Sequence, residues 1–439
     1  MRRNLSSKTT LCNTLSSRTP HNDRKFTAKL ELEIVKRDAD IMTKKICIFT
    51  AVFMISFSLS SGQESVDIGG YIKNMSSYQD GSFAGTPDDL GDFQNTVQTR
   101  LNISWYPLST LTAGIESRHL FIYQKNIKTG GGFMDIFAAD NYYFDLKEKW
   151  SDENDFQAVS EIDRLYLDWT LDNLQITLGR QRIAWGSALV WNPTDLFNPF
   201  NILDFDYLEK PGTDALYMQY YLGPLSQLDI AVSPGRKSEE VIYAVRYYFN
   251  FNDYDFNIIG GWQKKTFRLG AGWSGQLYGG GLRGEMLYSK PEISYETMNT
   301  TGTLPAEKKI DDPYFTVVIS YDYTFRNSFY WHTEYMYNGL GAVNNSSQRR
   351  LEILQSGELT PSRHSIFQEF SYDITPLWKG NVYIIFNPSD QSWIAAPSLQ
   401  YSMSDNWELY LTAFPSAGKL NSEFGDMPGW YFCRFKYSF

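Results

Sequence analysis

The sequence predicts an all-β chain that closes into a transmembrane antiparallel β-barrel of about 18 strands, with 16 as the alternative count. Three observations support this fold class: the composition, an alternation of apolar and polar residues, and a regular spacing of turns. Phe, Tyr and Trp make up 16% of the 439 residues, and the chain contains 32 glycines. Such a composition suits strands better than amphipathic helices, and it excludes a disordered chain.

The N-terminal part of the chain has the features of an export signal. Two basic residues, Lys44 and Lys45, precede an apolar run over 46–59, and small residues follow up to Gly62. This order is typical of a secretory signal peptide, and the run is shorter than the about 20 residues of a membrane-spanning helix. We therefore expect an upstream stretch that is a misassigned start or an extended signal region (1–41), a signal peptide (42–62) and one barrel domain (63–439).

Removal of the signal leaves a strongly acidic chain. Residues 1–62 carry 11 basic and 5 acidic side chains, so the mature chain keeps 29 and 45, a net charge of −16. An acidic exported protein is a poor candidate for binding nucleic acid. Cys433 is then the lone cysteine, which excludes an internal disulfide and a cysteine-based zinc site.

Alternation with a period of two marks the strands. In the stretch 162–171, the residues Leu165, Leu167 and Trp169 share one side, and polar residues share the other. The same pattern occurs in 99–105, 241–249, 267–273 and 315–325. A period of two gives a sheet one apolar and one polar face, which a soluble sandwich also has.

The spacing of the connections distinguishes a barrel from a sandwich. Every second connection is tight, at 107–109, 172–173, 223–224, 252–253, 274–276, 326–327, 376–377 and 404–405. The connections between them are often long, at 76–94, 124–160, 185–212, 290–311, 338–362 and 415–427. Short periplasmic turns and long extracellular loops are typical of outer-membrane barrels.

The C-terminus carries a second export feature. Tyr431, Cys433, Phe435, Tyr437 and Phe439 share one face of the last predicted strand. A final strand that ends in Phe, with aromatic residues two and four positions earlier, resembles the assembly signal of bacterial outer-membrane proteins. The resemblance assigns this role to Phe435, Tyr437 and Phe439, with the barrel-assembly machinery as the partner.

One segment departs from simple alternation. A Gly-Arg-Gln stretch at 179–181 leads to Trp185-Gly186, and an Asn-Pro-x-Asp-x-x-Asn-Pro stretch begins at Asn192. Asn and Asp side chains in such turns bond their own backbone, which predicts a stiff loop over 185–212. The loop either folds into the barrel and narrows it or packs on the outer rim. The candidate constriction residues are Trp191, Asn192, Asp195 and Asn198.

These motifs, together with Gly-Tyr-Ile-Lys at 70–73, resemble porin-like bacterial outer-membrane barrels, including the alginate-export type and related uncharacterised families. The resemblance implies a pore in the outer membrane of a Gram-negative-type bacterium. The resemblance indicates the class of barrel, but it does not identify the solute that passes.

Two arginines fit the pattern poorly. Arg180 and Arg182 continue the apolar face of Ile176 and Leu178, where a charge costs about 2–4 kcal/mol at the middle of a membrane. We therefore expect that they lie at the outer interface, or that a bulge at Gly179 turns them inward.

Charged residues on the polar faces are the candidates for lining a pore. They are Arg100, Glu116, Arg118, Arg164, Asp168, Arg246, Arg268, Arg283, Glu285, Asp322 and Glu334. One interpretation is that they pair with one another and stabilise a wet wall. The other is that a subset of the arginines near a constriction attracts anions.

The predicted function is passive diffusion of small polar solutes, anionic ones among them. The alternatives are an adhesin or structural barrel that acts through its outer loops, and a barrel hydrolase. His332 and Glu334 share a strand face, but the sequence assigns them no serine partner, so we expect no enzyme. The expected partners are outer-membrane lipid, the assembly machinery, small solutes and other copies of the chain, with no nucleic acid, metal or cofactor.

Overall fold

The computed structural model describes residues 65–80, 92–124, 143–153, 155–198, 209–298, 305–310, 312–349, 357–425 and 427–439. The predicted signal peptide and the residues before it lie outside this described part. No helix within it is long and apolar enough to cross a membrane.

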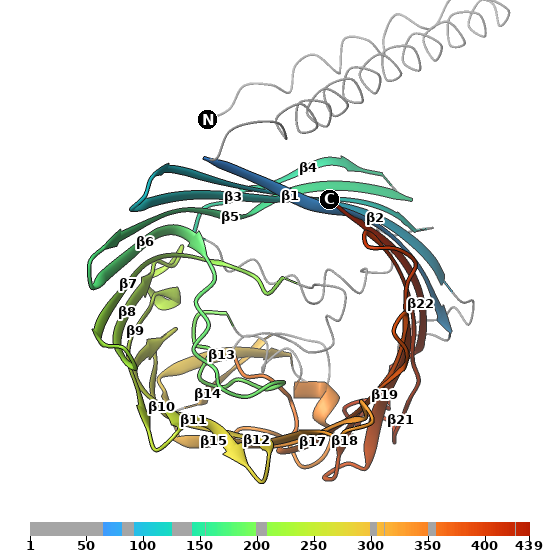
Figure 1. The fold of residues 1–439 in the computed structure, drawn as a ribbon. Helices are drawn as coiled ribbons and strands as arrows, with labels where there is room; N and C mark the ends of the chain where they lie inside the picture. Colours follow the sequence, from blue (N-terminus) through green and yellow to red (C-terminus); the bar gives the residue numbers. More distant parts are fainter. Residues whose placement is uncertain are drawn as a thin grey trace, which may run out of the picture. The chain divides into compact units, whose positions relative to one another are not determined.

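The described strands close into an 18-stranded antiparallel barrel (Figure 1). The strands are β1 Val66–Asp80, β2 Asp92–Leu108, β3 Leu111–Gln124, β5 Phe156–Leu171, β6 Leu174–Gln181, β7 Thr213–Gly223, β8 Ser226–Ser233, β9 Ile242–Phe251, β10 Tyr254–Gln263, β11 Thr266–Leu277, β12 Gly280–Pro291, β15 Tyr314–Thr324, β16 Tyr330–Asn338, β17 His364–Thr375, β18 Trp378–Asn387, β19 Ser392–Ser402, β20 Trp407–Phe414 and β22 Gly429–Ser438. The predicted fold class and the count of 18 are confirmed.

The ring is closed by the first and last strands. β1 pairs with β22 over ten residue pairs, from Tyr71↔Ser438 to Asp80↔Gly429. The amides of Gly70 and Phe439 each donate a 3.0 Å hydrogen bond to the other residue's carbonyl. A side chain at position 70 would place its Cβ 2.2 Å from the Arg100 carbonyl oxygen, so this close approach of strands requires glycine.

Several short elements lie in stretches that the sequence suggested were loops. They are β4 Lys147–Asp152, which pairs with β5; the hairpin of β13 Ile293–Met298 and β14 Pro305–Ile310; β21 Ser416–Ala417, which pairs with β19; and the 3-10 turn η2 Ser346–Arg349. A further 3-10 turn, η1 Ser238–Glu240, lies between β8 and β9.

One predicted turn is wrong. The sequence placed it at 274–276, but β11 continues to Leu277, and the chain reverses at Tyr278 and Gly279. Both of these residues have positive φ, 52° and 81°. Tyr278 is an uncommon residue in that conformation, so the Ser-Gly-Gln signal next to it was the more obvious choice.

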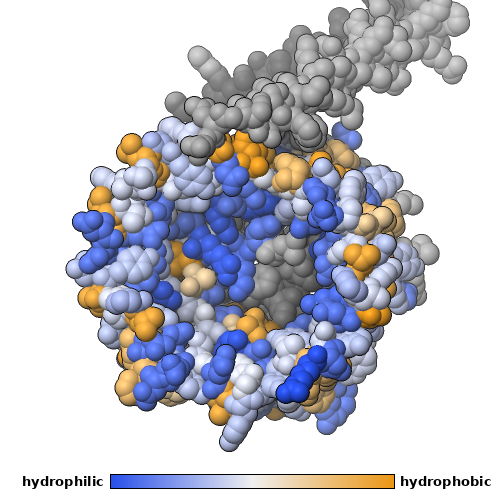
Figure 2. Space-filling view, in the orientation of Figure 1, coloured by the Kyte–Doolittle hydropathy of each residue, from blue (hydrophilic) through white to orange (hydrophobic). Residues whose placement is uncertain are grey.

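The two faces of the wall differ as the alternation predicted. Leu165, Leu167 and Trp169 on β5 are 44%, 51% and 50% exposed on the outer face. In the view along the barrel, hydrophilic residues surround the hollow in the ring (Figure 2). The wall thus presents apolar side chains outward and polar side chains inward, the arrangement of a water-filled barrel in a membrane.

Candidate functional site

The chain leaves the wall after β6 and passes through the barrel interior. β6 ends at Gln181, and β7, its neighbour in the wall, begins only at Thr213. Residues 182–198 run inside the ring (Figure 1) and hydrogen-bond to β12 and β16 on another part of the wall. Of the two alternatives for the predicted loop 185–212, these described residues follow the inward one. We call residues 182–198 the inner loop.

Glu285 on β12 holds the inner loop by its backbone. Its Oε1 accepts hydrogen bonds from the amides of Ser187 (2.5 Å) and Ala188 (2.8 Å). Its Oε2 accepts from the amide (3.0 Å) and the hydroxyl (2.7 Å) of Thr194. The residue is 0% exposed, so the carboxylate exchanges solvent for four donors of the loop.

Glu334 on β16 holds the loop in the same way a few residues further on. It accepts from the amides of Leu189 and Val190 at 3.3 Å and from that of Trp191 at 2.6 Å. This side chain is also 0% exposed. The sequence suggested that Glu285 and Glu334 line a pore; both instead lie beneath the loop, because its backbone amides need acceptors in the barrel interior.

The inner loop also braces itself. Asp195 accepts hydrogen bonds from the amides of Trp185 (2.5 Å) and Gly186 (2.6 Å). Asn198 donates to the Ile183 carbonyl at 3.1 Å. Burial raises the pKa of Asp195, and the two amide donors act in the opposite direction. The predicted stiffness of this Asn/Asp-rich stretch thus has a defined set of bonds.

Apolar packing fixes the loop against two parts of the wall. Trp185 packs edge-on against Phe197, with 5.2 Å between ring centroids, in a cluster with inner residues of β7 to β12. Trp191 packs edge-on against Phe367 of β17, with 6.3 Å between ring centroids, in a second cluster that extends to β22.

Gly186 lets the inner loop fold back on itself. A side chain at this position would place its Cβ 2.1 Å from the side chain of Asn192.

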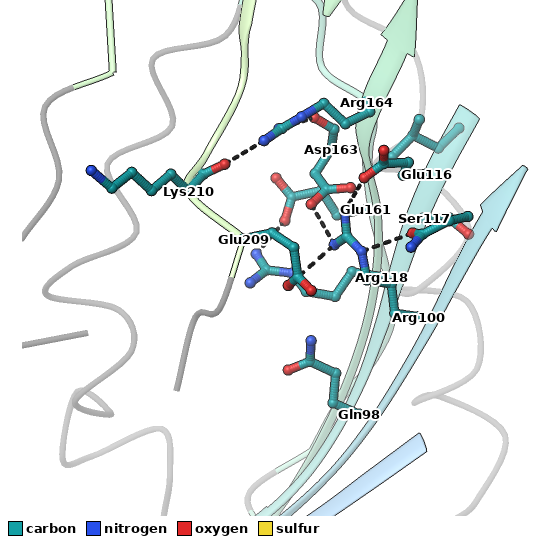
Figure 3. A network of polar contacts seen from close by, with 12 residues as sticks. Gln98, Arg100, Glu116, Ser117, Arg118, Glu161, Asp163, Arg164, Glu209 and Lys210 are labelled. Atoms are coloured by element: carbon teal, nitrogen blue, oxygen red, sulfur yellow. Dashed lines mark hydrogen bonds and ion pairs between the residues drawn. The ribbon is translucent and has the colours of Figure 1, made fainter. Parts of the chain in front are cut away.

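The wall formed by β2, β3 and β5 carries a polar network (Figure 3). Arg100 is at its centre, with a side chain that is 0% exposed. It bonds Asp163 at 2.7 Å and Asn102 at 2.9 Å, it contacts Glu116, and it lies 3.7 Å from Glu209. Three carboxylates therefore surround one buried guanidinium group.

The other two arginines of this wall are also engaged. Arg118 pairs with Glu161 at 2.7 Å. Arg164 donates to the main-chain carbonyl of Asp163 at 2.8 Å and to that of Lys210. The structure thus places Arg100, Arg118 and Arg164 on one part of the wall and surrounds them with acceptors.

The remaining charged candidates lie elsewhere on β5 and on other strands around the ring. The closest contacts are Arg246–Asp229 at 2.5 Å, Arg268–Glu358 at 2.8 Å, Arg283–Asp322, and Asp168 with Gln175 at 2.7 Å and Thr177 at 2.6 Å. These contacts favour the interpretation that the charges stabilise the wall. Arg268 is only 1% exposed, so it does not face open solvent.

Arg180 lies next to the end of β6 from which the inner loop departs, and it is buried. It is 1% exposed and pairs with Asp214 of β7 at 2.9 Å. It also donates to the carbonyls of Ile162 and Phe144, at 2.8 and 2.5 Å. Gly179 has a φ of +118°, but the β5–β6 and β6–β7 registers run through it without a shift. The expected bulge is therefore wrong: Arg180 is covered by neighbouring chain where β6 ends, while Arg182 is exposed in the inner loop.

Three acidic residues that hold loops to the wall were missed. Glu209 contacts Arg100 and accepts from the Tyr71 hydroxyl at 3.0 Å. Glu358 binds Arg268, and Glu423 accepts from Asn387 at 3.2 Å. Each lies in a long connection, where no periodicity shows which way a side chain points.

The residues that the structure describes contain no group of three or more His, Cys, Asp or Glu side chains that could hold a metal ion.

No protein-family model matches the chain, and no curated protein sequence matches it. Solved structures do resemble it. OccAB1 of Acinetobacter baumannii is 9% identical, with a TM-score of 0.53, over 87% of this chain and 99% of that one. The outer membrane protein opdK from Pseudomonas aeruginosa is 10% identical (TM-score 0.50; 85% and 98% covered), and OccK9 (OpdG) of the same species is 11% identical (0.51; 85% and 98%). At these identities the likeness concerns the fold.

Proposed function

We propose that this protein is an outer-membrane channel through which small polar solutes diffuse passively. The observation that carries the proposal is a closed barrel, apolar outside and polar inside, whose interior is crossed by a loop fixed to the wall. A polar interior suits a water-filled lumen through which small solutes pass. The inner loop then limits the size of what passes.

The location follows from the same features. A band of exposed Leu, Val, Ile and aromatic side chains on the outer face would be costly in water and is stable in lipid. One of the similar solved structures is described as an outer membrane protein, which supports an outer membrane of a Gram-negative-type bacterium as the site. Outer-membrane lipid, the assembly machinery and further copies of the chain stay proposed partners.

The structure favours a channel over a barrel that acts through its outer loops. The segments 182–198, 357–363 and 419–425 bond to inward-facing residues such as Glu285, Arg268 and Asn387. An adhesin acts through loops outside its barrel, so loops that bond to the barrel interior do not serve that role. The finer resemblance, to the alginate-export type, stays a proposal about the kind of barrel and names no solute.

Planar-bilayer recording tests the proposal. Purified, refolded protein should give discrete conductance steps, and liposomes that contain it should swell in small sugars, amino acids or organic acids. A lipid-hydrolysis assay on the same material addresses the hydrolase alternative. Correctly folded protein that gives neither steps nor swelling would rule out the channel.

A further inference from the structure

A buried histidine lies beside the carboxylate that holds the inner loop. His332 of β16 is 1% exposed. Its Nε2 is 2.9 Å from the Ser320 hydroxyl and 3.5 Å from Oε2 of Glu334. Its Nδ1 is 3.7 Å from Oε2 of Glu369 on β17. One imidazole thus touches two carboxylates, and one of them is bonded to the loop backbone.

The serine contact does not make this cluster a hydrolase. Ser320, His332 and Glu369 have the order of nucleophile, base and acid. Ser320 is 0% exposed, however, so no substrate carbonyl can reach its hydroxyl. The cluster acts on the structure instead.

The buried carboxylate of Glu334 needs a counter-charge, and His332 lies next to it. Its carboxylate is 0% exposed and receives three backbone amides, which carry only partial charge. A buried charge is stable when it has a counter-charge. Among the described residues, the ion-pair partner of Glu334 is His332, whose Nε2 lies 3.5 Å from Oε2 of Glu334.

We propose that His332 is a positioning residue for the inner loop. When it is protonated, it is the counter-charge of Glu334, which keeps the carboxylate ionised and bonded to residues 189–191. When it is neutral, this support is lost and the loop is held less firmly. The constriction is then tight at acidic pH and looser at alkaline pH, in the range where histidine titrates. This inference rests on the proposed channel function.

The groups around His332 include carboxylates that can balance the charge of a protonated imidazole. Ser320 and Asp322 face it from β15, Glu369 from β17, and Tyr330 and Glu334 from its own strand. Arg283 of β12 pairs with Asp322, which leaves Glu334 and Glu369 as the carboxylates next to the imidazole.

Single-channel recording across about pH 5 to 8 tests the proposal. We expect the open-channel noise and mean conductance of the unaltered protein to rise with pH. His332→Gln should abolish the pH dependence and show the noisy, high-conductance behaviour throughout. Glu334→Gln should also abolish the pH dependence, and the double variant should behave like Glu334→Gln alone, because the His332–Glu334 contact is already absent there.

His364→Gln is the matched control. This histidine begins β17, but its Nδ1 is 2.8 Å from the hydroxyl of Tyr335, which is 38% exposed on the outer face. It should keep the unaltered pH profile. Heat-resistant migration in gels establishes that each variant is folded. A folded His332→Gln channel that keeps the unaltered profile would overturn the inference, whereas absence of any conductance in the unaltered protein would overturn the channel itself.

Discussion

Replacing Glu285 by Gln should loosen the inner loop without unfolding the barrel. Each of its oxygens accepts two hydrogen bonds from the loop: Oε1 from Ser187 and Ala188, and Oε2 from the amide and hydroxyl of Thr194. Gln has the same shape but exchanges one acceptor oxygen for an amino group. Two of the four donors then lose their acceptor, whichever way the amide is turned.

The size of the effect follows from these contacts. A hydrogen bond to a charged acceptor contributes about 1.5–3 kcal/mol, so losing two weakens the attachment by about 3 kcal/mol at the lower limit. Each 1.4 kcal/mol is a factor of ten, so the detached population of the loop should rise about 100-fold. The strand that carries residue 285, β12, keeps its pairing with β11 and β15, so the barrel should resist heat as before.

Bilayer recording of conductance and open-channel noise measures this change. Deletion of residues 187–194 defines the limit of a missing loop and should raise the conductance most. Glu239→Gln is the control, because Glu239 lies on η1 with a side chain that is 51% exposed and pairs with Lys265. If Glu285→Gln matches the control while the deletion raises conductance, apolar packing rather than the carboxylate holds the loop.

Three further outcomes are expected. Changing Arg118 and Arg164 together to Gln removes two positive charges from a wall rich in carboxylates, so reversal potentials at low salt should show a lower anion-to-cation permeability ratio; an unchanged ratio would mean that neither charge acts on permeating ions. Deleting Phe439 removes the two hydrogen bonds to Gly70 beyond the β1–β22 pairs, and less heat-resistant barrel should reach the outer membrane; normal levels would contradict its role in assembly. N-terminal sequencing of outer-membrane material should find a mature chain that begins at Gln63; a chain that retains residues 1–41 would disprove the predicted signal.

The barrel itself could be predicted because its signals are local. A period of two on 162–171 shows which side chains face outward, and the tight turn at 172–173 ends that strand wherever the rest of the chain lies. Repeating this along the chain predicted about 18 strands, and the structure has 18 in the barrel. The failure at 274–276 has the same origin, since two turn-like stretches stand side by side and only pairing with β12 selects the second.

The candidate site was predicted in part. The Asn/Asp-rich stretch after Trp185 marked the inner loop as stiff, and its bonds to Asp195 are short-range. The wall residues that the loop contacts could not be predicted from their positions along the sequence. Glu285 and Glu334 follow it by about 100 and 145 residues, and they meet it only because the closed ring places β12 and β16 where the loop arrives.

The sequence by itself thus determined the fold class, the two faces of the wall and the residues able to cross or line the interior, because alternation and turn chemistry act between neighbours along the chain. Tertiary structure alone decided whether each charge faces water, a partner or the loop. Arg100 became the buried centre of three carboxylates and Glu334 the support of a loop. Both roles arise from strands and loops that are distant in sequence, and the free energy of a buried charge depends on those neighbours.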